Sequence, residues 1–255
     1  MADGFACSLV ELDIIGEALR LNVRPFPFDF PTHGETLEER KRLAVHVEKG
    51  LAQRGLTRGA AFAPVVTELV GLYAAARWSV TMLGTAGRRS LCVRAGSDGK
   101  NAVVVARHGD QMEFRPITPA SLVRAVVSLL PPLKPGPGGS VTVRLADLSS
   151  GSLPQRDEFS SDSFMQPVTP ARGRSGTQQA VIEAILRRPR TGAGYFVATA
   201  RGRNGRESEP ATLTWIDNDA GRYALIPDGR GYVTCTPADL PRIDQQLVRH
   251  MSTLD

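Results

Sequence analysis

The amino-acid sequence predicts an α+β protein in which helices flank a central antiparallel sheet. Between residues 79 and 116, four segments have strand length and strand periodicity and are joined by short glycine-containing turns. Strands joined by such short turns lie antiparallel to each other. A second observation is that one order of elements, a helix, several strands and a closing helix, occurs twice along the chain.

The chain also resembles itself. When the sequence is shifted by 118 residues, Ala106–Leu130 falls on Ala224–Val248 without a gap, and eight of the 25 positions are identical. The identities include a Thr-Pro-Ala helix opening, at Thr118 in one copy and Thr236 in the other. Such an opening can arise twice by chance, but the shared order of elements favours a quasi-twofold internal duplication. We therefore expect a single domain, 1–255, made of two related halves, about 1–145 and 177–255.

Helices and a proline-rich segment precede the strands. The pairs Ser8 with Glu11 and Thr36 with Glu39 have capping-box spacing, which predicts a helix start at each. The segment RPFPFDFPTHG, residues 24–34, cannot be helical because its prolines fix extended backbone. Its phenylalanines are expected to pack on the core as a strap, with peptide docking as the alternative. The expected helices cover about 9–20, 36–55 and a stretch that begins at Pro64.

Weaker patterns mark the rest of the chain. A helix is expected from Thr118 until Pro131 stops it, and the loop PGPGGS leads into another strand. Residues 146–176 are rich in serine, glycine and proline with little periodicity, which predicts a flexible linker between the halves. The second half is then expected to hold helices over about 178–188 and 240–251, with strands between them.

Composition excludes several classes of protein. The 255 residues are 42% hydrophobic and 22% charged, as in ordinary globular proteins, and no apolar run is long enough to span a membrane. The N-terminus carries acids where a signal peptide carries cations, so a cytoplasmic protein is expected. The three cysteines, Cys7, Cys92 and Cys235, have no metal-ligand or disulfide spacing, so we expect neither a metal nor another cofactor.

Positive charge is concentrated in one segment. The formal net charge is +5, yet residues 172–206 alone hold eight arginines and a single acid, Glu183. Arginine suits bidentate contacts to carboxylate or phosphate, so this segment is either a solvated surface or a binding surface for an acidic partner. Nucleic acid is disfavoured as that partner because the sequence lacks the signatures of nucleic-acid-binding modules and only 6% of its residues are aromatic.

No catalytic constellation is visible. The four histidines stand singly, and neither a GxSxG elbow nor a Walker loop occurs. The stretch DNDAG, residues 217–221, resembles part of a calcium loop but lacks the later ligands, so a β-turn is the better interpretation. An enzyme whose site is assembled from distant residues is the third hypothesis, after a binding protein and a regulator that binds anions or nucleic acid through residues 172–206.

Three groups of motifs resemble one family. They are FACSLVELDIIGEALRLNVRPFPFDFPTHGETLEER near the N-terminus, TPASL in the middle, and RRPRTGAGYFVATARGRNGRESEPATLTWIDNDAGRY towards the C-terminus. Together they are similar to the EspG family, the specific chaperones of the ESX, or type VII, secretion systems of actinobacteria. The resemblance spans nearly the whole chain except the predicted linker. Asn218 departs from the family pattern, where threonine is expected before the second aspartate, and this change falls in a turn.

The resemblance implies binding without chemistry. Family members have a quasi-twofold α+β fold and hold the hydrophobic tip of a secreted helical hairpin, typically the PPE partner of a PE–PPE pair, so that the pair stays soluble. The client of this chain is then expected to be a PE/PPE-like or WXG100-like heterodimer. The density of arginines beside aromatic residues predicts the contact surface in the C-terminal half. The predicted residues are Arg187, Arg188, Arg190, Tyr195, Phe196 and Trp215.

Overall fold

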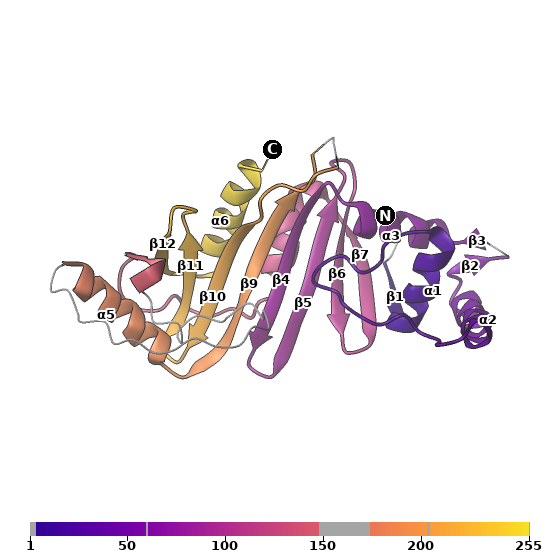
Figure 1. Cartoon of the computed structure of the whole chain (residues 1–255), viewed down its shortest axis with the longest axis horizontal. Helices are drawn as coiled ribbons and strands as arrows, with labels where there is room; N and C mark the ends of the chain where they lie inside the picture. The colour runs from indigo at the N-terminus through magenta and orange to yellow at the C-terminus, as the bar shows by residue number, and fades with distance from the viewer. Residues whose placement is uncertain (1–3, 60, 148–173, 203–204, 255) are drawn as a thin grey trace.

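A ten-stranded antiparallel sheet is the centre of the computed structural model, which describes residues 4–59, 61–147, 174–202 and 205–254. Its strand order is β1-β7-β6-β5-β4-β9-β10-β11-β12-β8. The predicted halves meet where β4 pairs with β9 (Figure 1), but β8, at the end of the predicted first half, pairs with β12 at the far edge of the second. The α+β class with a central antiparallel sheet is therefore confirmed.

The sheet strands are β1 Phe5–Ser8, β4 Trp78–Ala86, β5 Arg89–Ser97, β6 Ala102–His108, β7 Gln111–Ile117, β8 Val141–Arg144, β9 Arg190–Ala200, β10 Ala211–Asn218, β11 Gly221–Pro227 and β12 Tyr232–Pro237. A small second sheet pairs β2 Thr57–Arg58 with β3 Ala61–Phe62. The helices are α1 Leu9–Leu19, α2 Leu37–Gln53, α3 Pro64–Ala75, α4 Leu122–Val127, α5 Arg174–Arg187 and α6 Leu240–Ser252.

Both predicted capping boxes form. The Ser8 hydroxyl accepts from the Glu11 amide at 3.1 Å while the Glu11 carboxylate accepts from the Ser8 amide at 2.8 Å. Thr36 and Glu39 exchange the same two bonds at the start of α2. These reciprocal bonds satisfy amides that have no partner inside the helix, which explains why both helices begin where the sequence predicted.

Two boundaries differ from the prediction. The helix after Thr118 opens as a 3₁₀ turn, Pro119–Ser121, and its α-helical part ends at Val127, before the stop expected at Pro131. Helix α5 begins at Arg174, so the C-terminal end of the segment predicted as a linker is helical. Leu145–Asp147 forms a 3₁₀ turn at the other end of that segment, and residues 148–173 lie outside the described residues.

Helices cover both faces of the sheet. Strand β6 is buried on both faces: Ala102 and Val104 pack in the cluster that α4 and α6 cover, whereas Val103 and Val105 pack in the cluster beneath α1 and α3. The second face also carries α5, which packs through Ile182 and Leu186 on the β8, β11 and β12 end. Helices α5 and α6 thus lie on opposite faces of the C-terminal half.

Residues 24–34 cross the second face as the predicted strap. Phe28 and Phe30 are 1% and 4% exposed, and Phe28 packs against Tyr73 of α3. Phe26 does not follow the prediction, because its side chain remains 45% exposed. Two of the three phenylalanines therefore fasten the strap to the core.

A buried carboxylate holds the polar side of the strap. Asp13 of α1 is 3% exposed and accepts from the guanidinium groups of Arg24 and Arg40 at 2.6 and 2.5 Å, and from the amide of His33 at 2.8 Å. Burial alone would raise the pKa of Asp13, but these donors outweigh it and lower the pKa to about 2. The ionised carboxylate thus ties α1, the strap and α2 together.

Two glycines make room for a tryptophan at the seam between the halves. Gly84 of β4 and Gly194 of β9 lie opposite each other in the ladder, and a Cβ on either would meet the indole of Trp215. Strand β4 continues past Gly84 to Ala86, and Gly87 makes the turn to β5 with φ of 59°. Glycine is needed at position 84 because a larger side chain would displace Trp215.

An ion pair is buried inside the second half. Arg222 is 0% exposed, and its guanidinium contacts both oxygens of Asp217, at 2.6 and 2.8 Å, and the carbonyl of Pro131 at 3.0 Å. Between them, the Asn218 side chain accepts from the amides of Ala220 and Gly221. The stretch DNDAG is therefore a turn closed by its own side chains, as predicted.

Candidate functional site

Of the six residues predicted to form the contact surface, two arginines are engaged in local ion pairs. Arg187 donates to Glu183 one helical turn away at 3.0 Å. Arg188 makes a bidentate contact with Asp219 in the β10–β11 turn, at 2.7 and 2.8 Å. The hydrogen bonds from Arg188 lower the pKa of the Asp219 carboxyl. These two arginines are exposed, but their charges are already matched within the chain.

The predicted aromatic residues divide between core and surface. Phe196 and Trp215 are 0% exposed and pack with ring centroids 5.0 Å apart beneath α4 and α6. Strand alternation places Tyr195 on the opposite face, where it is half-buried, and Arg190 is exposed at the start of β9. Phe196 and Trp215 are therefore core residues, and the prediction that they contact a partner is not compatible with their burial.

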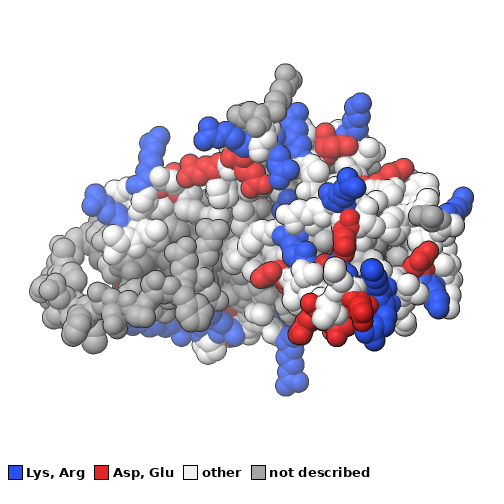
Figure 2. Space-filling view, turned by 45° about the vertical axis from the view of Figure 1, so that its right-hand side comes forward, with Lys and Arg blue, Asp and Glu red and all other residues white. Residues whose placement is uncertain are grey.

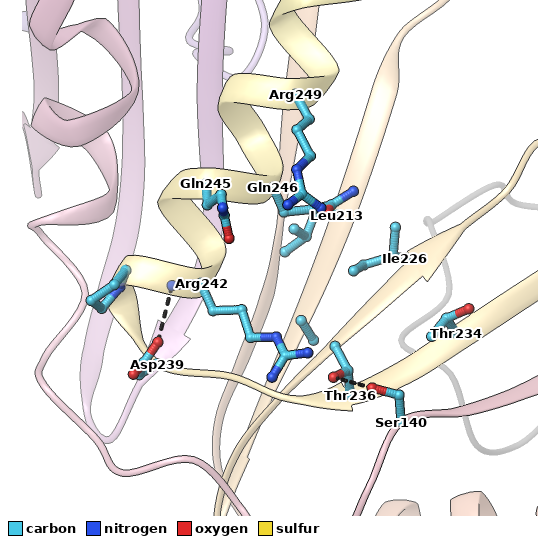
Figure 3. A pocket seen from close by; sticks show the side chains of 12 residues that line it. Ser140, Leu213, Ile226, Thr234, Thr236, Asp239, Arg242, Gln245, Gln246 and Arg249 are labelled. Carbon is cyan, nitrogen blue, oxygen red and sulfur yellow. Dashed lines mark hydrogen bonds between the residues drawn. The ribbon is translucent and has the colours of Figure 1, made fainter.

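A groove that was not predicted from the sequence lies on the face of the C-terminal half that carries α6, opposite to α5. We call it the α6 groove; its volume is about 650 Å³. Helix α6 forms one wall, and strands β10 to β12 with the loop before β8 form the floor and the other wall (Figure 3). The lining residues are Ser140, Leu213, Ala224, Ile226, Thr234, Thr236, Asp239, Pro241, Arg242, Gln245, Gln246 and Arg249.

Helix α6 places its polar residues by its periodicity. The Asp239 carboxylate caps the helix by accepting from the Arg242 amide at 3.0 Å, and Pro241 occupies the first turn, where no amide is lost. Ile243 and Leu247 are fully buried on the core side. The helix therefore turns another stripe, from Arg242 to Arg249, towards the groove.

The floor and far wall combine apolar surface with hydroxyl groups. Leu213 and Ala224 are buried at the floor, and Ile226 is half-buried beside them. On the far wall, the hydroxyls of Thr236 and Ser140 lie 2.8 Å apart and hydrogen-bond to each other. The groove can thus accept a chain segment with small apolar groups and polar edges.

The two arginines of the groove have no ion-pair partner among the described residues. Figure 3 shows the side chains of Arg242 and Arg249 extending from α6 over the groove, that of Arg242 in the direction of Thr236. The nearby carboxylate of Asp239 is engaged with the helix amide. Unlike Arg188, these guanidinium groups are available to an acidic partner.

Charge elsewhere is more evenly mixed. At the N-terminal end, which is turned forward in Figure 2, basic and acidic side chains are interleaved. Arg54 of that end, for example, contacts Glu11, and Arg40 contacts Glu17. Arg40 and Arg54 are therefore paired within the chain, as Arg188 is, whereas Arg242 and Arg249 have no ion pair among the described residues.

Other chemistry finds little support in the described part of the chain. It contains no group of three or more histidine, cysteine, aspartate or glutamate residues able to hold a metal ion. Burial raises the pKa of Cys92 and of Cys235 to about 11, so neither thiol is activated as a nucleophile. None of the described helices is long and apolar enough to cross a membrane.

The signal for the groove was present in the sequence but was outweighed. The arginine-rich segment 172–206 predicts a binding surface because its cations are close together, whereas Arg242 and Arg249 are seven residues apart. Seven residues are nearly two helical turns, so this spacing brings both side chains to one face. The helix 240–251 was predicted, and its polar face was the available indication.

The chain is similar to one known protein family and to solved structures. The model of the EspG family matches residues 8–249. Among solved structures, the Mycobacterium tuberculosis type VII secretion system chaperone EspG5, in a complex with the PE25-PPE41 dimer, is similar to this chain with a TM-score of 0.68. The two sequences are 14% identical over 99% of this chain and 97% of that chain, so this match shows a common fold. Comparison with the curated proteins gave no match. Because the family model covers nearly all of the sequence, the chain belongs to the EspG family of type VII secretion chaperones.

Proposed function

We propose that this EspG-family chaperone acts in the cytoplasm, where it binds the apolar tip of a secreted PE/PPE-like or WXG100-like helical hairpin and keeps it soluble for type VII secretion. The observation that carries the proposal is the family match over residues 8–249. A structure of the same fold, EspG5, holds the PE25-PPE41 dimer, which supports a dimeric hairpin client here. Covering an exposed apolar patch removes the surface through which such hairpins would aggregate.

The fold supports two related halves. On this proposal, β4 to β7 with α4 correspond to β9 to β12 with α6. The 118-residue shift relates the end of β6, β7 and α4 to the end of β11, β12 and α6. The sheet order supports the correspondence, because β4 and β9 pair at the centre and the strands that follow each of them run outwards in chain order. A duplication of this kind offers two versions of one surface, of which only one has to bind the client.

The C-terminal half offers two candidate contact surfaces on opposite faces. One is the α5 face, with Arg187, Arg188, Arg190 and Tyr195. The other is the α6 groove. We place the client at the α6 groove because its arginines are unpaired within the described chain, whereas Arg188 is neutralised by Asp219. The α5 face remains the second candidate.

Co-expression tests the function. Each helical-hairpin pair encoded in the source genome is produced with and without the chain, and the complexes are separated by size exclusion chromatography. We expect at least one pair to co-elute with the chain and to aggregate without it. If no hairpin pair co-elutes and a nucleic acid or metabolite does, the chaperone proposal fails and a regulator that binds through residues 172–206 replaces it.

A further inference from the structure

The geometry points to the α6 groove as a site for an extended acidic segment, in which two carboxylates about three residues apart pair with Arg242 and Arg249. This inference rests on the proposed function, since the segment is taken to come from the tip of the client hairpin. Beyond the proposed function, it names the groups of the client that are recognised, two carboxylates, and the two side chains that recognise them.

The charge of the groove is the first step. Arg242 and Arg249 line one wall, and no hydrogen bond or ion pair engages either guanidinium among the described residues. An arginine that keeps its full charge beside an apolar floor favours a carboxylate that brings two acceptor oxygens. Asp239 is the only acid among the described residues that line the groove, and it caps α6, so we assign the counter-charge to a partner.

The spacing of the arginines is the second step. Seven residues on a helix correspond to about 10 Å along its axis, at 1.5 Å per residue. An extended chain in the polyproline II conformation has three residues per turn and rises about 3.1 Å per residue, so side chains three residues apart lie on one face about 9 Å apart. An acidic residue at each end of such a segment therefore meets both arginines, while the residues between them lie over Ile226.

The shape of the groove selects an extended chain. A volume of about 650 Å³ lies within the usual range of small-ligand sites. A helix bonds its own backbone groups, so it would leave the hydroxyl groups of the strand wall unused. The hydroxyls of Ser140 and Thr236 bond to each other and that of Thr234 bonds to Thr142, but each oxygen has two lone pairs and can also accept from the backbone N–H of an extended segment.

The arrangement disfavours phosphate as the ligand. Phosphate sites at a helix start use free backbone amides, but here Asp239 accepts from the Arg242 amide and Pro241 has no N–H. A peptide with separate carboxylates matches the arrangement better.

The first experiment uses a synthetic peptide and does not require the client. The capped peptide Ac-Glu-Leu-Ala-Glu-NH₂ and its Gln-Leu-Ala-Gln counterpart are titrated into the full chain at millimolar concentration, and the Nε–Hε resonances of the arginines are followed by NMR. Peaks are assigned with the variants Arg242→Lys and Arg249→Lys. We expect the glutamate peptide to shift both arginine peaks saturably and the glutamine peptide to bind at least tenfold more weakly.

Two results of that titration would overturn the inference. Equal response to the two peptides, or no shift with either, would mean that the groove does not recognise carboxylates. Tighter binding of inorganic phosphate or of a short oligothymidylate would make it a phosphate site. Because these readouts need no client, they hold whether or not a hairpin pair co-elutes.

The second experiment uses the hairpin pair that co-elutes with the wild-type chain. The variant Arg242→Glu/Arg249→Glu is expected to bind it at least tenfold more weakly, with a smaller dependence on salt than the wild type, and Arg242→Gln/Arg249→Gln should fall between them. The matched control is Arg42→Glu/Lys49→Glu, which makes the same charge change at the same seven-residue spacing on α2, at the opposite end of the sheet (Figure 1). If both charge reversals weaken binding equally, the effect comes from net charge and the inference is wrong. If neither weakens binding, the groove does not contact the client, although the chaperone function still holds.

Discussion

Replacing Asp217 by asparagine tests how far one buried ion pair supports the second half of the fold. The substitution keeps the size of the side chain but removes the charge that faces the guanidinium of Arg222, which is 0% exposed and held at 2.6 and 2.8 Å. Removing one partner of a buried pair leaves an uncompensated charge in the interior, which costs about 3–5 kcal/mol. For a chain of this size that loss lowers the melting temperature by roughly 10 °C.

The assay is urea unfolding followed by circular dichroism, with Asp219→Asn as the matched control. Asp219 also makes a bidentate contact with an arginine, Arg188, but that pair is exposed, so its loss should change the midpoint little. The double variant Asp217→Leu/Arg222→Met should be more stable than Asp217→Asn, because it removes both charges at once. If the buried and exposed variants unfold at the same urea concentration, the reasoning from burial is refuted.

Three further substitutions test separate features. Because the pKa of Asp13 is lowered to about 2, its ionised form should stabilise the fold by about 2 kcal/mol above pH 4. This contribution should disappear as the pH falls from about 4 to 2. If the unfolding free energy of Asp13→Asn depends on pH as steeply as that of the wild type over this range, the prediction is contradicted. Gly194→Ala should lower the free energy of unfolding in urea by about 1–3 kcal/mol, because the new methyl group meets the buried indole of Trp215 and the backbone. In the control Gly71→Ala, on α3, the methyl group meets nothing, so the change should be neutral or stabilising. Equal effects of the two substitutions would argue against close packing of Trp215 on Gly194. In the client co-elution assay, Arg188→Glu/Arg190→Glu should weaken binding less than reversal of the groove arginines does, and the opposite order would move the client to the α5 face.

The local parts of the fold could be predicted from sequence because their causes are local. The capping boxes at Ser8 and Thr36 are each satisfied within three residues, so a short window contains all the information. The strands from Trp78 to Ile117 were recognised because their turns are short and their apolar residues recur at strand spacing. The same holds for Asn218, which closes its own turn.

The contact surface could not be predicted in the same way because it depends on distant pairings. Tyr195 and Phe196 are neighbours, yet only the position of α6 decides that Phe196 faces the core. The sequence alone presents Arg188 as an available cation, but in the structure the β10–β11 turn places Asp219 beside it, 31 residues further along the chain. The groove itself joins α6 to the loop before β8, about 100 residues earlier in the chain.

The two edges of the sheet have a consequence for how the protein associates with other chains. An open sheet has two edge strands, and each edge is a template on which another chain can add a strand. Here both edges are only four residues long, β1 and β8. At one edge the Ala6 carbonyl already accepts from Arg54 at 2.9 Å, and at the other Arg144 ends the strand and donates to Tyr232. Edges this short present few backbone groups to another chain, so strand addition at the sheet edges is disfavoured even when the protein is concentrated.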